Sequence, residues 1–369
     1  MPTQAEWLAS KRAIVARFTT SNDRCGALQL LSVAVPIVGL WCAIYFTSLI
    51  SVWLVAPEIL CLSLFLLRGF VLMHDCGHDS LFRSRSLNRT SGFLLGVLSG
   101  IPQQVWAENH RRHHATNGNW SEYRGPLNVS CVSDYLALST GEKRRYRYTR
   151  DILMSPIAGC LYFLVNPRLT WLRASVDLAS RSFSRIGGRA SLVKSPLKGC
   201  ASMAHYRYML GNNLVLLAAA ALTAWAVGPW LFLLTYVLSG SLAGGFGIVL
   251  FTAQHNFEHS YASSREGWSR DEAALSGTSF LIFPGWLNWI TADIAYHHVH
   301  HLCASVPNYR LAACHKEFEH LFSGVRRVRL LEIPSALKTI LWDLPARRLV
   351  SVAEVIGSRA AHGTLEHKP

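Results

Sequence analysis

Residues 208–257 read YMLGNNLVLLAAAALTAWAVGPWLFLLTYVLSGSLAGGFGIVLFTAQHNF, and this stretch contains no charged side chain. A helix rises 1.5 Å per residue and needs about 20 apolar residues to cross the hydrocarbon core of a bilayer, so the stretch is long enough for two crossings. Gly228-Pro229 is a turn signal that separates halves near Leu214–Val227 and Trp230–Phe251. The stretch therefore predicts a hairpin of two membrane helices.

A second apolar stretch runs from Cys25 to Leu67, with Glu58 as its only charged residue and a turn expected near 48–57. Half of the 369 residues are hydrophobic and 16% are charged, compared with roughly 25% charged residues in an ordinary soluble domain. A large soluble protein with two very apolar core helices would need charged helix faces, which both stretches lack. We therefore predict an all-α integral-membrane fold with four transmembrane helices in two hairpins, interfacial helices and a cytosolic helical cap.

The net charge of +14 is unevenly distributed. The turns inside both hairpins hold no Lys or Arg, whereas residues 111–207 and the C-terminal third are rich in them. Because positive residues favour the cytoplasmic side, we expect a multi-pass protein of a bacterial cytoplasmic membrane with both termini in the cytoplasm. No recognition-helix or stacking-sheet motif accompanies the charge, so we expect a basic cap against anionic lipid headgroups and no nucleic-acid partner.

These features divide the chain into three expected regions. Residues 1–26 form a cytosolic N-terminal segment, 27–311 the membrane domain, and 312–369 a cytosolic C-terminal segment. The transmembrane hairpins are expected at about 27–73 and 210–254. The segments between and after them are expected to build the cap.

Eleven of the sixteen histidines lie in four short clusters, each at or just beyond an apolar segment. Residues four apart, or three and four apart, share one face of a helix, so the rings of each cluster can reach one metal ion or two adjacent ions. A single such histidine is more often a hydrogen-bonded residue at a helix end, but four clusters on one side of the membrane indicate a metal site. The clusters are His74 and His78; His110, His113 and His114; His255 and His259; and His297, His298, His300 and His301.

Neutral imidazole is a ligand for iron, copper, nickel and zinc, and eight or nine such ligands exceed what one ion accepts. Two metal ions are therefore implied. Zinc would suit hydrolysis, but no serine, cysteine or carboxylate nucleophile accompanies the clusters, so a redox metal fits better. A membrane metal carrier is the rival from another class; against it, no acidic or broken-helix pathway crosses the predicted bilayer.

The clusters resemble the three histidine boxes of the membrane fatty-acid desaturase family, and the wider strings resemble its omega-6, acyl-lipid branch. The similarity covers roughly Phe65 to Leu311. The strings are HDCGH (74–78), HRRHHATNG (110–118), QHNFEH (254–259), and YHHVHHL (296–302) followed by VPNYRL (306–311).

This resemblance implies a four-helix membrane domain under a cytosolic cap, a cytoplasmic active site, and two histidine-bound iron ions that cycle between Fe2+ and Fe3+. It also implies O2 as co-substrate and electrons from an external donor. A ninth ligand in this family comes from the end of the fourth membrane helix, where His255 is the match and His259 the alternative. The ligands implied by the boxes are His74, His78, His110, His113, His114, His297, His300 and His301.

Several neighbours are candidates for an indirect role. His298 follows His297 by about 100° around a helix, so it is expected to point away from the ligand face and to lie either behind the ligands or at the surface. Three carboxylates are candidates to orient ligand imidazoles by contacting the second nitrogen of the ring: Asp75, Glu258 and Asp293. For each of them, a solvent-exposed charge at a helix end is an equally good interpretation.

The implied activity is removal of two hydrogen atoms from adjacent carbons of a long acyl chain, which forms a cis double bond. Rivals that share the metal site are a fatty-acyl hydroxylase or acetylenase, an alkane hydroxylase and a carotenoid oxygenase. The acyl group is expected on a lipid, coenzyme A or a carrier protein. The expected electron donor is a separate protein, either a ferredoxin or a small cytochrome.

Overall fold

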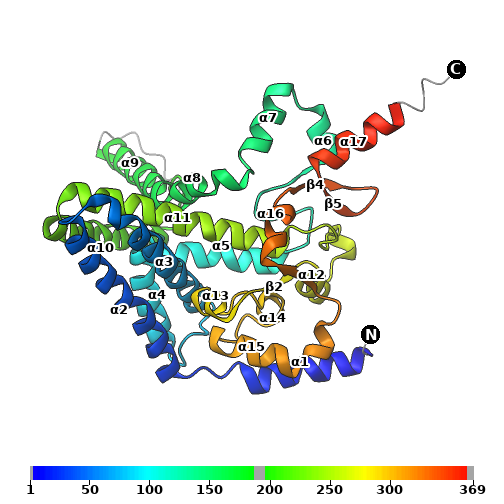
Figure 1. Cartoon of the computed structure of the whole chain (residues 1–369), viewed down its shortest axis with the longest axis horizontal. Helices are drawn as coiled ribbons and strands as arrows, with labels where there is room; N and C mark the ends of the chain where they lie inside the picture. The colour runs from blue at the N-terminus through cyan, green and yellow to red at the C-terminus, as the bar shows by residue number, and fades with distance from the viewer. Residues whose placement is uncertain (1–2, 187–195, 364–369) are drawn as a thin grey trace. The chain divides into compact units, whose positions relative to one another are not determined.

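The computed structural model describes residues 3–186 and 196–363, which divide into two compact units. We call residues 21–110 and 156–245 the helical unit, and residues 3–20, 111–155 and 246–363 the mixed unit. The helices are α1 (Gln4–Phe18), α2 (Asp23–Ser48), α3 (Ala56–Gly77), α4 (Arg85–Ser99), α5 (Gln103–Thr116), α6 (Val132–Ala137), α7 (Thr140–Tyr148), α8 (Ser155–Cys160), α9 (Asn166–Ile186), α10 (Met203–Val227), α11 (Pro229–His255), α12 (Arg270–Ser276), α13 (Gly285–Ile290), α14 (His297–Leu302), α15 (Asn308–Glu317), α16 (Ile333–Ala336) and α17 (Val352–Gly363) (Figure 1).

Short helical turns and strands complete the secondary structure. The 3-10 turns are η1 (Val52–Val55), η2 (Ile152–Met154), η4 (Arg265–Gly267), η5 (Glu319–Phe322) and η6 (Leu330–Glu332), and η3 (Leu161–Val165) is a π-helical turn. The strands are β1 (Ser130–Cys131), β2 (Ser279–Ile282), β3 (Arg326–Arg329), β4 (Thr339–Asp343) and β5 (Arg348–Ser351).

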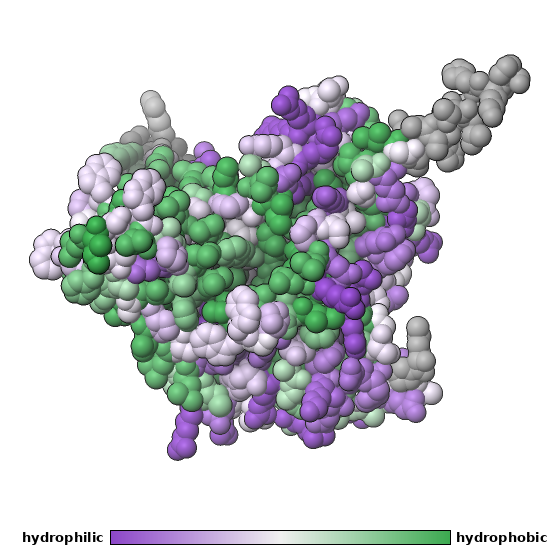
Figure 2. Space-filling view, viewed as in Figure 1, coloured by the Kyte–Doolittle hydropathy of each residue, from purple (hydrophilic) through white to green (hydrophobic). Residues whose placement is uncertain are grey.

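Both predicted hairpins are present as pairs of long helices, α2 with α3 and α10 with α11. Among the described residues, five helical segments are long and apolar enough to cross a membrane: the four hairpin segments, of which that of α3 begins at η1, and Ile152–Phe183. No span was expected at Ile152–Phe183, which contains Arg168, Arg173 and Asp177. Figure 2 shows hydrophobic side chains gathered over the surface of the helical unit.

A buried arginine of α3 forms hydrogen bonds to α2. Arg68 is 2% exposed within the candidate span of α3. Its guanidinium donates to Ser32 Oγ, with Nε 3.0 Å away, and to the side-chain oxygen of Gln29. A charge in an apolar bundle is costly unless it is hydrogen-bonded, so these two polar residues of α2 specify how the hairpin pairs.

Close packing of α8 on α11 requires glycine. A Cβ atom on Gly159 would overlap the backbone of Gly244 and Gly245. Small residues at such contacts let helix backbones approach closely, which is how helices associate in membranes without a hydrophobic driving force.

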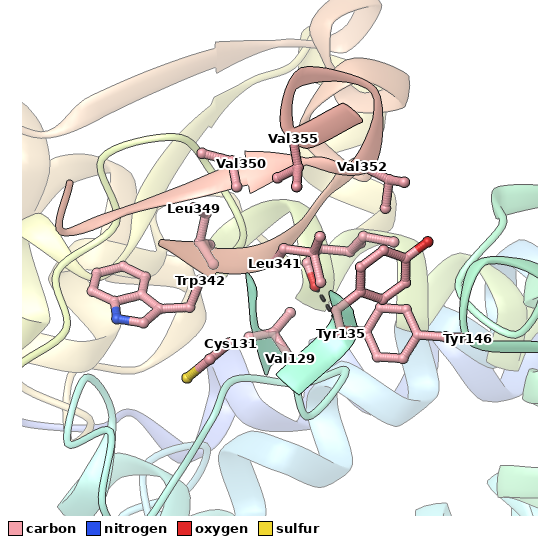
Figure 3. Packing of buried hydrophobic residues seen from close by; sticks show 11 residues of the cluster. Val129, Cys131, Tyr135, Tyr146, Leu341, Trp342, Leu349, Val350, Val352 and Val355 are labelled. Atoms are coloured by element: carbon pink, nitrogen blue, oxygen red, sulfur yellow. Dashed lines mark hydrogen bonds between the residues drawn. The ribbon is translucent and has the colours of Figure 1, made fainter. Parts of the chain in front are cut away.

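The mixed unit contains two small sheets that the all-α prediction did not include. In the first, β1 pairs parallel with β4 and β4 antiparallel with β5; in the second, β2 pairs parallel with β3. Figure 3 shows the buried cluster between the first sheet and α6, α7 and α17. The Tyr146 hydroxyl anchors α7 to this sheet, donating to Ile340 O at 2.6 Å and accepting from Ser130 N at 3.0 Å.

The N-terminal helix is also part of the mixed unit. Phe18 of α1 packs edge-on against Phe318 in a buried cluster. Asp271 receives hydrogen bonds from Trp7 Nε1 and Lys11 Nζ, both at 2.7 Å. The burial of Asp271 would raise its pKa, but these donors lower it more, so the net shift is downward.

Candidate metal centre

Four predicted ligands converge inside the mixed unit. Each of His113, His255, His297 and His301 is buried, and one ring nitrogen from each lies within 4.8 Å of the others. His113 Nε2 lies 3.2 Å from His301 Nε2, and His297 Nε2 lies 3.0 Å from His255 Nε2. Three elements supply these rings: α5, the last residue of α11, and the first turn of α14.

Local geometry fixes which nitrogen faces the cluster. His255 Nδ1 lies 3.0 Å from the carbonyl oxygen of Gly277, which follows α12. That carbonyl can only accept, so Nδ1 carries the proton and Nε2 presents its lone pair to the other three rings. His297 and His301 stand four residues apart on α14, so both point to the same side of the helix.

Aromatic rings border this cluster. The centroids of Phe251 and Tyr123 lie 5.0 and 4.9 Å from that of His113. Phe251 also lies 5.1 Å from His255. An apolar border of this kind limits water access, and it strengthens electrostatic interactions inside the cluster.

A second set of predicted ligands lies in the helical unit. The ring centroid of His74 is 4.8 Å from that of His78 and 4.6 Å from that of His110. Asp75 is 2% exposed, and its Oδ1 lies 3.1 Å from His74 Nδ1. Trp106 stacks on His110 with centroids 4.6 Å apart.

The remaining two predicted ligands form a pair in the mixed unit. His300 Nε2 lies 3.0 Å from His114 Nε2, and both side chains are buried. Each belongs to a helix that also carries a ligand of the first cluster: His114 follows His113 on α5, and His300 follows His297 by three residues on α14.

The other candidates lie in different surroundings. His259 is exposed, with 76% of its side chain accessible, and Glu258 forms an ion pair with Arg348 at 2.9 Å. Asp293 lies in the turn between α13 and α14, with φ at 55°. The structure therefore gives Asp75 a contact with a ligand ring and places His259 at the surface.

His298 points away from the ligand cluster but is fully buried rather than at the surface. Its Nε2 lies 2.8 Å from Nδ1 of His315, a residue that the sequence analysis did not single out. Burial lowers the pKa of both rings, and for His298 the neighbouring His315 and Arg327 lower it further. Both rings are therefore neutral at physiological pH. They pack on the side of α14 that faces away from the ligand cluster.

The donor set favours a transition metal. Burial lowers the pKa of His301 well below its ordinary value, with further lowering from its histidine neighbours, so the ring is available as a neutral ligand. Four neutral imidazoles without a thiolate or carboxylate suit iron, copper, nickel or zinc rather than calcium or magnesium. The residues present in the mixed unit thus fit an iron ion.

Comparisons with known proteins agree with this chemistry. The family described as "Fatty acid desaturase" matches residues 51–329. A fatty acid desaturase of Bacillus subtilis is 33% identical over 91% of this chain and 88% of its own length. An sn-1 acyl-lipid omega-3 desaturase (ferredoxin) of Synechocystis is 28% identical over 66% of this chain and 61% of its own length. An sn-1 oleoyl-lipid 12-desaturase of Arthrospira platensis is 25% identical over 79% and 75%.

The match to the family covers most of the chain and includes every predicted ligand. The helices long enough to span a membrane and the buried histidine clusters are consistent with it. The chain therefore belongs to the fatty acid desaturase family and is a fatty-acyl desaturase.

Proposed function

We propose that the protein is a di-iron enzyme that uses O2 to introduce a cis double bond into a long acyl chain. The observation that carries this proposal is the convergence of four buried imidazoles, those of His113, His255, His297 and His301, within 4.8 Å. In the overall reaction the substrate loses two hydrogen atoms, an external donor supplies two electrons, and two protons are taken up as O2 becomes two water molecules.

The second ion is proposed to bind the other five predicted ligands. Two helices support this assignment, because α5 and α14 each carry histidines at i, i+3 and i+4. Such a helix directs adjacent rings toward neighbouring positions, so it supplies ligands to two ions at once. The five ligands are His74, His78, His110, His114 and His300.

When bound, the iron ions supply the one-electron chemistry that hydrogen-atom removal requires, since no side-chain base can deprotonate a methylene group. The chain's own residues hold and orient the ligands. The Gly277 carbonyl fixes the tautomer of His255, and Asp75 contacts the second nitrogen of His74. Phe251 and Tyr123 border the cluster and limit access of water to it.

The substrate is proposed to be an acyl chain on a membrane lipid, rather than on coenzyme A or a carrier protein. Support comes from two of the three relatives described above, which are named as acyl-lipid or oleoyl-lipid desaturases. The electron donor is proposed to be a separate ferredoxin or small cytochrome. The ferredoxin in the name of the Synechocystis relative supports the first of these.

The protein is proposed to span a bacterial cytoplasmic membrane with both termini and the histidine clusters in the cytoplasm. The Lys and Arg residues support this orientation, since they are missing from the turns inside the two hairpins and frequent outside them.

The test is expression in a host whose own lipids lack polyunsaturated chains, followed by gas chromatography of the fatty-acid methyl esters. We expect a new unsaturated chain that requires O2, and none from a matched strain expressing His113→Ala at equal membrane abundance. A hydroxylated chain as the main product would replace the proposal with a hydroxylase. Activity of zinc-loaded, iron-free protein would refute the iron chemistry.

A further inference from the structure

A cavity of about 210 Å³ lies inside the helical unit. Its walls are mostly apolar and come from α2, α3, α4, η3, α10 and α11. The walls include Trp41, Leu62, Leu94, Phe163, Leu216 and Phe232.

The cavity is separate from the histidines of the same unit. Phe163 in its wall contacts Phe70 at 5.1 Å, Phe70 contacts Trp106 at 5.2 Å, and Trp106 stacks on His110. A series of three aromatic rings thus leads from the cavity wall to His110, and no histidine lines the cavity. The cavity is not the space immediately around the predicted metal ligands.

One end of the cavity is polar. Ser99 and Ser239 line it, are 3% and 1% exposed, and have hydroxyls without a hydrogen-bond partner among the described residues. Helical Ser and Thr usually satisfy their hydroxyls at the carbonyl four residues back. Thr223 and Ser241 do so in α10 and α11, accepted by Ala219 O and Val237 O. The hydroxyls of Ser99 and Ser239 depart from that pattern, and both residues line the cavity.

A guanidinium group adjoins this polar end. Arg168 Nη2 donates to the carbonyl oxygen of Gly100, the residue after Ser99, at 2.6 Å. Its Nε and Nη1 are buried and have no hydrogen-bond partner, and Arg168 forms no ion pair within residues 3–186 and 196–363. Arg168 also follows the cavity residue Leu164 by one helical turn. Buried charged donors without an acceptor are costly, so this end of the cavity calls for an anionic oxygen.

The other end of the cavity reaches the apolar surface of the unit. Ala219 is exposed, and Thr223 and Phe232 are half-buried, whereas Ser99, Phe163 and Ser239 are buried. An occupant can therefore enter from the surrounding lipid with its apolar body along the walls and its polar end inside. The methyl end of an acyl chain is a poor match for the inner end, because it would leave both hydroxyls and the guanidinium without acceptors.

We propose that this cavity is a binding site for an anionic acyl lipid, whose chain packs between α2, α10 and α11 and whose headgroup oxygens accept hydrogen bonds from Arg168, Ser99 and Ser239. The lipid at this site is a bound component of the protein and not the chain that is oxidised. The inference goes beyond the desaturase reaction and does not depend on iron.

The test measures lipid retention by the full-length protein. Delipidated protein is placed in micelles containing equal amounts of phosphatidylglycerol and phosphatidylcholine of the same chains, and native mass spectrometry counts the lipids that remain bound. We expect preferential retention of phosphatidylglycerol. Ala220→Phe should remove it by filling the cavity, whereas Ala218→Phe, on the exposed side of the same helix, should not.

The charge requirement is tested separately. Arg168→Gln should lower the preference for phosphatidylglycerol at least about tenfold, because a hydrogen bond to a charged group is lost. Arg168→Lys should restore part of it, and Arg173→Gln, on the exposed side of α9, is the control. Because Arg168 also holds Gly100, each variant is first checked by its melting temperature, and Ala220→Phe leaves that bond intact.

Replacing phosphatidylglycerol with oleate distinguishes a phosphate headgroup from a free carboxylate, and Arg168-dependent retention of either supports the site. Equal retention of both phospholipids by the wild-type protein would overturn the proposal. So would unchanged retention by Ala220→Phe. Neither outcome bears on desaturation, which the fatty-acid profile of the expression host reports independently.

Discussion

His255 Nε2 lies 3.0 Å from His297 Nε2, although the two residues are separated by the whole segment from α12 to α13. The contact joins the last residue of a membrane-length helix to the first residue of α14. The end of α11 therefore forms part of the ligand cluster directly, which bears on the choice between His255 and His259.

We expect His255→Ala to lower both iron content and turnover to near zero, because the variant removes a buried imidazole from the four-ring cluster. His259→Ala should keep most of both, since this side chain is 76% accessible and contacts Glu258 at 3.7 Å. The measurement is iron per protein by mass spectrometry, together with product yield per protein.

Correct folding of both variants is checked by their abundance in the membrane and their elution volume in size-exclusion chromatography. An iron-poor, inactive His259→Ala beside an active His255→Ala would exchange the two roles.

The hairpins were predictable because their sequences lack charge over lengths that no soluble helix requires. The small sheets were not, since β1 has two residues and its partner β4 lies some 200 positions later in the chain. Pairing at that distance leaves no periodic signal near Ser130.

The ligand clusters were predictable because their signal is local: spacing at i, i+3 and i+4 places side chains on one face of a helix. The carbonyl of Gly277 and the ring of His315 were not, although they contact His255 and His298. A backbone carbonyl has no residue-type signature, and an isolated histidine is usually an ordinary polar residue.

Asp75→Asn is expected to weaken iron binding by about 10–100-fold, because an orienting carboxylate beside His74 is replaced by a neutral amide. Asp79→Asn is the matched control, since Asp79 is half-exposed at φ 55° and Asn tolerates that conformation. Iron affinity is measured by competition with a chelator. Equal affinities for the two variants would remove Asp75 from the site.

Acid should destabilise the protein through the His298–His315 pair. Both pKa values are lowered in the folded state by burial, whereas in the unfolded chain they return to about 6.5. As pH falls from about 6.5 toward the folded pKa values, the unfolded state binds more protons than the folded state. The contribution of this pair to the free energy of unfolding is therefore fully present above about pH 6.5 and is lost as pH falls through this range.

His315→Gln should reduce the slope of the unfolding free energy against pH by up to one bound proton, which is about 1.4 kcal/mol per pH unit. The measurement is the thermal midpoint of metal-free protein at several pH values from 8 to 5, with His320→Gln at the exposed turn η5 as control. If His315→Gln and the wild type follow parallel curves, the pair does not control acid stability.

Tyr146→Phe should loosen the sheet of the mixed unit without affecting iron. The hydroxyl accepts from Ser130 N and donates to Ile340 O, so it connects β1 and β4 to α7 through a single buried group. Removing it leaves two backbone groups without that partner, which costs about 1–3 kcal/mol for each group that stays buried and unsatisfied. Hydrogen exchange should therefore quicken at residues 130–146 and 339–351, where Tyr148→Phe, whose ring is 60% exposed, should change nothing. Protection that is equal in the two variants would show that the apolar cluster around Leu341 holds the sheet without this hydroxyl.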